Sequence, residues 1–159
     1  MDFRFLWLFC RFSGALFEER DATAEAVTQF NEAHSIQRGE LLGFLSCGIP
    51  LHGQRRAVED NIAMSRFFIL VAEDVWDAPP ASFANEFKLA LKYKADPAMP
   101  LERIALFFRR PRPDEDTDGR MAAFRQTEAA VTLPQFDFSD AADFRAQLDR
   151  LLADWLPGA

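Results

Sequence analysis

The chain has 159 residues, 49% of them hydrophobic, and this length and composition predict one domain with a single substantial core. Its 25 acidic and 18 basic side chains give a formal net charge of -7. That sign does not suit a general phosphate-backbone binder, so nucleic acid is not an expected partner. The apolar stretch from Phe3 to Cys10 contains Arg4, is too short to span a bilayer, and lacks the features of a signal peptide. We therefore expect a cytoplasmic protein without a membrane partner.

Five apolar segments of strand length alternate with segments that have helical periodicity. The expected strands cover residues 3–9, 41–46, 67–72, 104–108 and 131–138. Pro134 lies in the last of them and suits a sheet edge. This alternation is typical of repeated strand–helix units around a parallel sheet. Right-handed crossovers then predict a doubly wound α/β sheet of five strands in the order 2-1-3-4-5, with helices on both faces.

Four segments between and after these strands are expected to be amphipathic helices. The apolar stripe of the first recurs at intervals of three and four residues, at Leu16, Arg20, Ala24, Val27 and Phe30. The others cover residues 54–64, a segment that Ser82 would cap, and residues 141–156. We expect a single domain over residues 1–159, in which residues 111–118 form an exposed loop or a partly disordered insertion.

The two cysteines and two histidines do not form a metal-ligand pattern. Cys10 and Cys47 each end an apolar run, and we expect both to be buried free thiols. His34 and His52 are isolated, and neither lies near a credible nucleophile in the predicted topology. We therefore expect neither a metal site nor a bound cofactor.

In an open parallel sheet of this kind, ligands bind beyond the carboxyl ends of the strands, where the strand order reverses. This rule selects the loops at residues 11–15, 47–53 and 73–81, together with the helix that contains Glu86. Glu86 lies at the border of the apolar stripe of that helix, within about its first turn, where the helix dipole stabilises a carboxylate. It is the catalytic candidate, although acidic residues are common in first helical turns for the same reason.

Three residues at the same edge can contact a ligand, and each has an alternative structural role. Trp76 can stack on a base or on nicotinamide, or it can cover the core. Ser13, which precedes Gly14, can help to admit a phosphate at a helix N-terminus, or it can cap the helix. Arg11 can bind a phosphate, or it can mark the hydrated end of its strand. The chain contains neither the GxGxxG nor the GxxxxGK[ST] fingerprint.

Four segments match, in chain order, short motifs of one known family. They are residues 16–20 (LFEER), 61–76 (NIAMSRFFILVAEDVW), 82–92 (SFANEFKLALK) and 121–156. The first resembles the DL-x-x-ER motif of a bacterial TIR-like domain that is often fused to NACHT or TPR modules. The second is similar to the helix, third strand and loop of that domain, and the third to its Glu-bearing helix. The fourth is similar to its last helix, strand and helix.

This resemblance implies a flavodoxin-like, TIR-like fold and an activity. Catalytic TIR domains cleave the nicotinamide–ribose bond of NAD with a Glu in the matching helix, which by position is Glu86. The chain would then be an NAD nucleosidase, or an NAD-derived signalling module of a bacterial defence system, with NAD or a related nucleotide as its substrate. The implied substrate-binding residues are Arg11, Ser13, Asp74, Trp76 and Phe83. TIR enzymes commonly self-associate to complete the site, so the resemblance also implies a homo-oligomer.

Two other functions stay open. The family usually has Ser-Ser-Thr-Phe and Asp in its first loop, where this chain has residues 10–13 and Ala15. That departure, and Ser65 in place of an acidic residue, favour a non-catalytic domain for homotypic assembly or sensing. A nucleoside deoxyribosyltransferase-like enzyme shares the scaffold and uses a Glu against the same type of N-glycosidic bond. The glycine-rich approach to the Glu of that family is replaced here by residues 78–81 (APPA).

Overall fold

A computed structural model describes the chain at residues 2–47, 54–73, 83–111 and 119–157. Its five strands are all parallel and lie in the order β2-β1-β3-β4-β5. The predicted α/β fold and strand order are thereby confirmed, and this order is that of flavodoxin-like sheets. The strands are β1 (Arg4–Ser13), β2 (Glu40–Cys47), β3 (Phe67–Ala72), β4 (Arg103–Arg109) and β5 (Gln135–Phe138).

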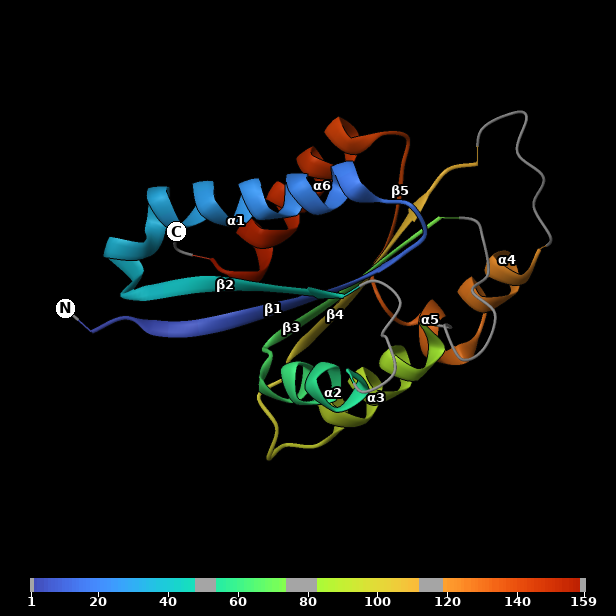
Figure 1. Ribbon diagram of the computed structural model, residues 1–159, viewed down its shortest axis with the longest axis horizontal. Coiled ribbons are helices and arrows are strands. Elements are labelled where there is room, and N and C mark those ends of the chain that lie inside the picture. Colours follow the sequence, from blue (N-terminus) through green and yellow to red (C-terminus); the bar gives the residue numbers. More distant parts are fainter. Residues whose placement is uncertain (1, 48–53, 74–82, 112–118, 158–159) are drawn as a thin grey trace.

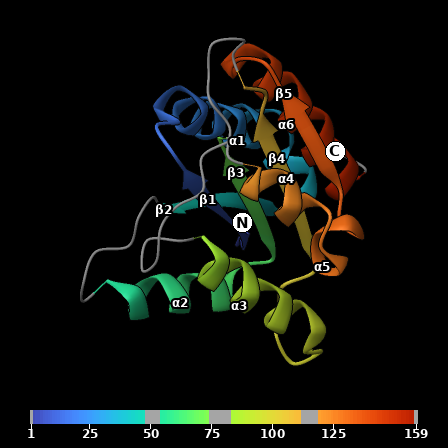
Figure 2. The same cartoon turned by 90° about the vertical axis from the view of Figure 1, so that its right-hand side faces the viewer.

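The helices of the described residues form a layer on each side of the sheet. They are α1 (Phe17–Arg38), α2 (Arg55–Met64), α3 (Ala84–Ala95), α4 (Arg120–Arg125), α5 (Glu128–Val131) and α6 (Ala141–Trp155). Figure 1 shows α1 and α6 on one face of the sheet, and α2 and α3 on the other with α4 and α5. Figure 2 shows the twist of the sheet between its edge strands β2 and β5. Among these helices, none is both long enough and apolar enough to cross a membrane.

Each face of the sheet has its own apolar core, because successive strand residues point to opposite faces. On β1, Leu8 and Cys10 belong to the core that α1 and α6 close, whereas Phe9 belongs to the core under α2 and α3. All six residues of β3 are buried. A central strand of a parallel sheet is covered on both sides, which explains why its sequence is a continuous apolar run rather than an alternating one.

The structure differs from the sequence-based expectations at three places. The first strand continues to Ser13, so Arg11 belongs to the strand and not to the loop that follows it. Residues 131–138 do not form one strand, because α5 ends at Val131 and β5 begins only after Pro134. On α1, Thr23 is buried where Ala24 was expected. Ser82 and residues 112–118 of the expected loop lie outside the described residues.

An amide side chain covers part of the open edge of the sheet. Asn31 of α1 donates from Nδ2 to the carbonyl of Leu42 at 2.8 Å, and its Oδ1 accepts from the Leu42 amide at 2.8 Å. Leu42 lies on β2, which is an edge strand. Backbone groups on an edge strand otherwise form a template for another strand. Asn31 therefore fills the place that one residue of an adjacent strand would take.

Phe107 on β4 is expected to be a major contributor to stability. It is fully buried, stacks on Phe136 with ring centroids 4.8 Å apart, and meets Phe144 edge-on at 5.2 Å. Phe107→Ala should lower the free energy of unfolding by about 3–5 kcal/mol, measured by urea denaturation. Ile36→Ala is the control, because Ile36 is 72% exposed and its loss should cost less than about 0.5 kcal/mol. Equal effects of the two substitutions would contradict the assigned core.

Candidate functional site

The carboxyl edge of the sheet contains a buried ion pair between Arg11 and Glu86. Arg11 lies two residues after Phe9 on β1, so its side chain points to the same face, under α3. Its Nε donates to Oε1 of Glu86 at 2.8 Å, and its Nη1 donates to the carbonyl of Phe12. The side chain of Arg11 is 0% exposed and that of Glu86 is 8% exposed. The structure thus brings together two of the predicted site residues from segments 75 positions apart.

Two sources of positive charge lie next to the Glu86 carboxylate. It lies in the first turn of α3, where the backbone N–H groups of the helix carry partial positive charge. The guanidinium of Arg11 provides a full positive charge at hydrogen-bond distance. A carboxylate as buried as this one would be costly without such partners, and Arg11 would be equally costly without Glu86. Each charge therefore makes the burial of the other tolerable.

Only one oxygen of the Glu86 carboxylate is engaged by the described residues. Oε1 accepts the hydrogen bond from Arg11, and no described residue donates to Oε2. The Glu86 side chain is 8% exposed, so part of it remains within reach of solvent. The ion pair consequently fixes the orientation of the carboxylate while leaving one oxygen for another contact.

Glu86 lines a groove between α2 and α3, which we call the α2–α3 groove. Its volume is about 370 Å³, and it is lined by Arg55, Val58, Glu59, Asn85, Glu86, Lys88, Leu89 and Lys92. The groove exists because α2 and α3 pack side by side on the same face of the sheet (Figure 2). The groove runs along both helices as far as Lys92, and its end at Arg55 and Glu86, beside the start of both helices, is the end nearest the carboxyl edge where ligands bind in such sheets. The basic residues of the groove were not singled out from the sequence, although Lys88 and Lys92 share a helix face by their spacing.

The other predicted site residues have different surroundings. Ser13 ends β1 and is fully buried, and its carbonyl accepts from the Glu73 amide at 3.0 Å. The N-cap of α1 is Leu16 without a side-chain cap, so the capping role considered for Ser13 is wrong. Phe83 is fully buried and meets Phe124 edge-on at 5.1 Å, within the core under α3. Asp74 and Trp76 lie outside the described residues, and the roles of all four in binding stay predictions.

The two thiols are free and lie on opposite faces of the sheet. Cys10 belongs to the core under α1 and α6, whereas Cys47 packs against the core under α2 and α3. Burial raises the pKa of the Cys47 thiol to about 11, and burial likewise raises the pKa of Cys10. Thiols with raised pKa values are poor nucleophiles at neutral pH. Cys10 is fully buried as expected, while Cys47 is only half-buried.

A second cavity lies at the carboxyl edge on the side of α1. Its volume is about 480 Å³, and its charged lining residues are Glu18, Glu19, Glu73 and Arg109. Glu19 is 6% exposed, and burial raises the pKa of its carboxyl. Gly14 lies directly against the Glu73 side chain. A Cβ at position 14 would lie 2.7 Å from Cδ of Glu73, which is too close for a side chain unless Glu73 moves. The sequence analysis did not single out Glu19, so it missed this buried acid.

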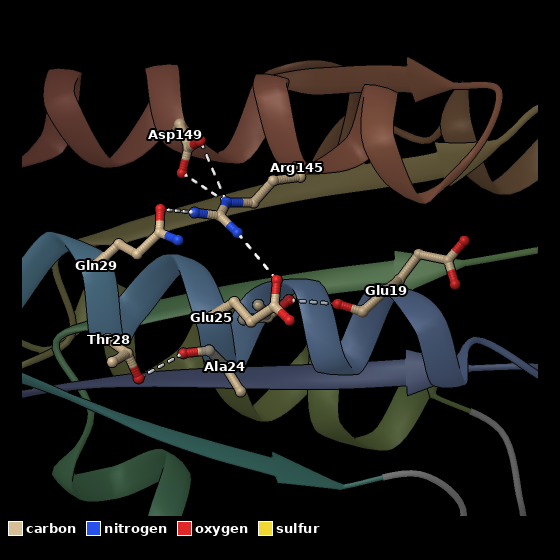
Figure 3. Close-up of polar contacts among 8 residues, drawn as sticks. Glu19, Ala24, Glu25, Thr28, Gln29, Arg145 and Asp149 are labelled. Carbon is tan, nitrogen blue, oxygen red and sulfur yellow. Dashed lines mark hydrogen bonds and ion pairs between the residues drawn. The ribbon is translucent and has the colours of Figure 1, made fainter.

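Polar contacts on the outer side of the molecule join helices and do not form a reactive site. Figure 3 shows Arg145 reaching from α6 toward α1. It pairs with Asp149 on its own helix at 3.0 Å and with Glu25 at 3.4 Å, and it donates to Gln29 at 2.6 Å. Exposed pairs of this kind each contribute about 0–1 kcal/mol. Among the residues that the structure describes, no group of His, Cys, Asp and Glu side chains could hold a metal ion.

Comparison with known proteins adds no family assignment. No protein-family model matches the chain, and no curated protein matches it significantly. The function must therefore be inferred from the site itself and from the resemblance of the short motifs.

The ion pair between Arg11 and Glu86 predicts a non-additive mutant cycle. Arg11→Met leaves the Glu86 carboxylate buried without its cation, and should lower the free energy of unfolding by about 3–5 kcal/mol. Adding Glu86→Leu should restore most of this loss, because the buried charge is then removed together with its partner. Urea unfolding of the two single variants and the double variant measures the coupling. Additive losses would contradict an energetically coupled pair.

We expect a substitution that removes the charge of Glu19 to stabilise the protein, by an amount that depends on pH. Burial raises the folded-state pKa of Glu19 above its ordinary value of 4.5. Ionised Glu19 therefore destabilises the folded state fully at pH values above the raised pKa, and this destabilisation disappears at pH values below 4.5. Glu19→Gln should therefore be more stable than wild type at pH 7, and this advantage should shrink as the pH falls toward 4. Thermal unfolding of both proteins between pH 4 and pH 8 measures the difference. A constant difference over that range would contradict the assignment.

Proposed function

We propose that this chain is a TIR-like domain that hydrolyses the nicotinamide–ribose bond of NAD or a closely related nucleotide. The observation that carries this proposal is the state of Glu86, a buried carboxylate at the carboxyl edge with one oxygen held by Arg11 and the other unengaged beside a groove. The sheet order and the resemblance of residues 82–92 to the Glu-bearing helix of TIR-like domains support it. The first of these arguments comes from the strand order and the second from a sequence motif, so they are separate lines of support.

The proposed reaction uses Glu86 as an electrostatic catalyst. The bond between the ribose C1′ and the nicotinamide nitrogen breaks, and its electron pair moves to the ring nitrogen, so nicotinamide leaves as a neutral molecule. Positive charge then develops on the ribose, and Oε2 of Glu86 stabilises it. A water molecule adds to C1′ and loses a proton to solvent, which completes the hydrolysis. A unit positive charge 4 Å from the carboxylate gains about 4 kcal/mol at an effective dielectric constant of about 20.

Arg11 acts in this scheme as a positioning residue. Its bond to Oε1 restricts rotation of the carboxylate, so Oε2 needs little reorganisation when charge develops on the substrate. Its own positive charge also weakens the attraction that Glu86 exerts on an oxocarbenium ion. Self-association of TIR-like domains could add further groups around the same edge, and we include a homo-oligomer in the proposal for that reason.

A charge-neutral substitution of Glu86 tests the catalytic role. Glu86→Gln keeps an oxygen that accepts the bond from Arg11 but removes the negative charge. Nicotinamide release from NAD by concentrated protein should fall by about 100-fold or more. Glu128→Gln is the matched control, because Glu128 lies in the first turn of α5 and is exposed, and it should release nicotinamide at the wild-type rate. Circular dichroism checks that both variants fold, and equal rates for wild type and Glu86→Gln would overturn the proposal.

The same ion pair also favours a second candidate, a non-catalytic assembly or sensor domain. Arg11 already neutralises the charge of Glu86, and a structural ion pair needs no substrate. The first-loop departures from the family pattern point in the same direction. In this case wild-type protein would release no nicotinamide at any concentration, while its mass in light scattering would rise with concentration.

A further inference from the structure

The α2–α3 groove contains three cationic side chains that have no anionic partner among the described residues. Arg55 begins α2, and Lys88 and Lys92 lie one turn apart on α3. Arg38, Arg66 and Arg125 each pair with a carboxylate at 2.9 Å or less, whereas these three cations are gathered in one groove without such a pair in the part of the chain that the structure describes. An excess of unpaired positive charge at one groove is unexpected in a chain with a net charge of -7.

These exposed cations repel one another weakly, by about 0.2–0.5 kcal/mol for a pair four residues apart, and a bound anion would relieve that repulsion. Residues four apart on a helix have Cβ atoms about 6 Å apart, so Lys88 and Lys92 repel each other across one turn. Arg55 adds a third positive charge from the facing helix. Of the two acids that line the groove, Glu86 is already neutralised by Arg11, which leaves Glu59 as the other negative group. The local balance is therefore positive.

The remainder of the lining indicates the kind of anion. Val58, which is 8% exposed, and the half-buried Leu89 give the groove an apolar floor between its charged walls. A volume of about 370 Å³ is at the small end of the range for sites that bind small organic molecules. Apolar floor and cationic walls together suit a phosphorylated molecule with a flat organic part better than a bare inorganic ion.

We propose that the α2–α3 groove binds the diphosphate group of a nucleoside diphosphate or dinucleotide, with Lys88, Lys92 and Arg55 contacting its phosphoryl oxygens. Val58 and Leu89 contact the organic part of the ligand. Glu86 lines the same groove, so a ribose attached to the diphosphate reaches the carboxylate that the proposed function requires. The choice of a nucleotide rests on that proposed function, whereas the diphosphate contacts rest on the three cations.

Binding of ADP, measured by isothermal titration calorimetry with the full chain, tests this inference without any turnover. ADP should bind to wild type, and Lys88→Ala and Lys92→Ala should each weaken binding by about tenfold or more, since each removes a charge-assisted contact to phosphate. Lys94→Ala is the matched control, because Lys94 is exposed on the same helix and does not line the groove. It should bind ADP as wild type does, and Lys88→Arg should retain most of the affinity.

The outcomes separate this inference from the hydrolase proposal. ADP binding that is lost in Lys88→Ala, in a protein that releases no nicotinamide, would support the groove and reject the hydrolysis. Nicotinamide release with unchanged ADP affinity and unchanged KM in both lysine variants would reject the groove and keep the hydrolysis. Absence of ADP binding to wild type, or an equal loss in Lys94→Ala, overturns the inference. Pyrophosphate that binds as tightly as ADP overturns the assignment of a nucleotide.

Discussion

Arg11 imposes the constraint on which the arrangement of this edge depends, because it is a full positive charge on a strand that is buried on both faces. β1 lies between β2 and β3, and Arg11 is 0% exposed, so water cannot solvate its guanidinium group. An unpaired ion in that position would cost several kcal/mol. Glu86 provides the compensation, and the first turn of α3 must therefore stay within hydrogen-bond distance of β1. The orientation of that carboxylate follows from the same requirement.

Most of the fold could be predicted from the sequence, because the sheet is held by long apolar runs. Residues 67–72 carry no polar side chain, and the structure assigns these residues to β3. The strand order follows from the handedness of crossovers, which does not depend on side-chain detail. Prediction was weakest near Pro134, where residues 128–131 form one helical turn before a strand of four residues. Elements that short are decided by tertiary packing rather than by periodicity.

The candidate site was only partly predictable for a related reason. Topology placed Arg11 and Glu86 at one edge, but their contact depends on whether Arg11 points to the face of β1 that α3 covers. Arg11 lies two residues after Phe9, and this spacing places both side chains on the same face of the sheet. The spacing is informative only if the strand is known to continue past Cys10. Glu19 was missed because acids in a first helical turn usually face solvent. The α2–α3 groove required the packing of two helices, which a single sequence does not define.

The contact of Asn31 with β2 limits how copies of this chain can associate. A strand added to β2 would have to bond to Leu42, whose amide and carbonyl are already bonded to the Asn31 side chain. Sheet extension at Leu42 would first break both of these bonds, and the half-buried amide of Asn31 would then need new partners. Association by helix surfaces meets no such obstacle. The Asn31 contact therefore disfavours oligomers that extend the sheet through β2 and favours those built from helical contacts.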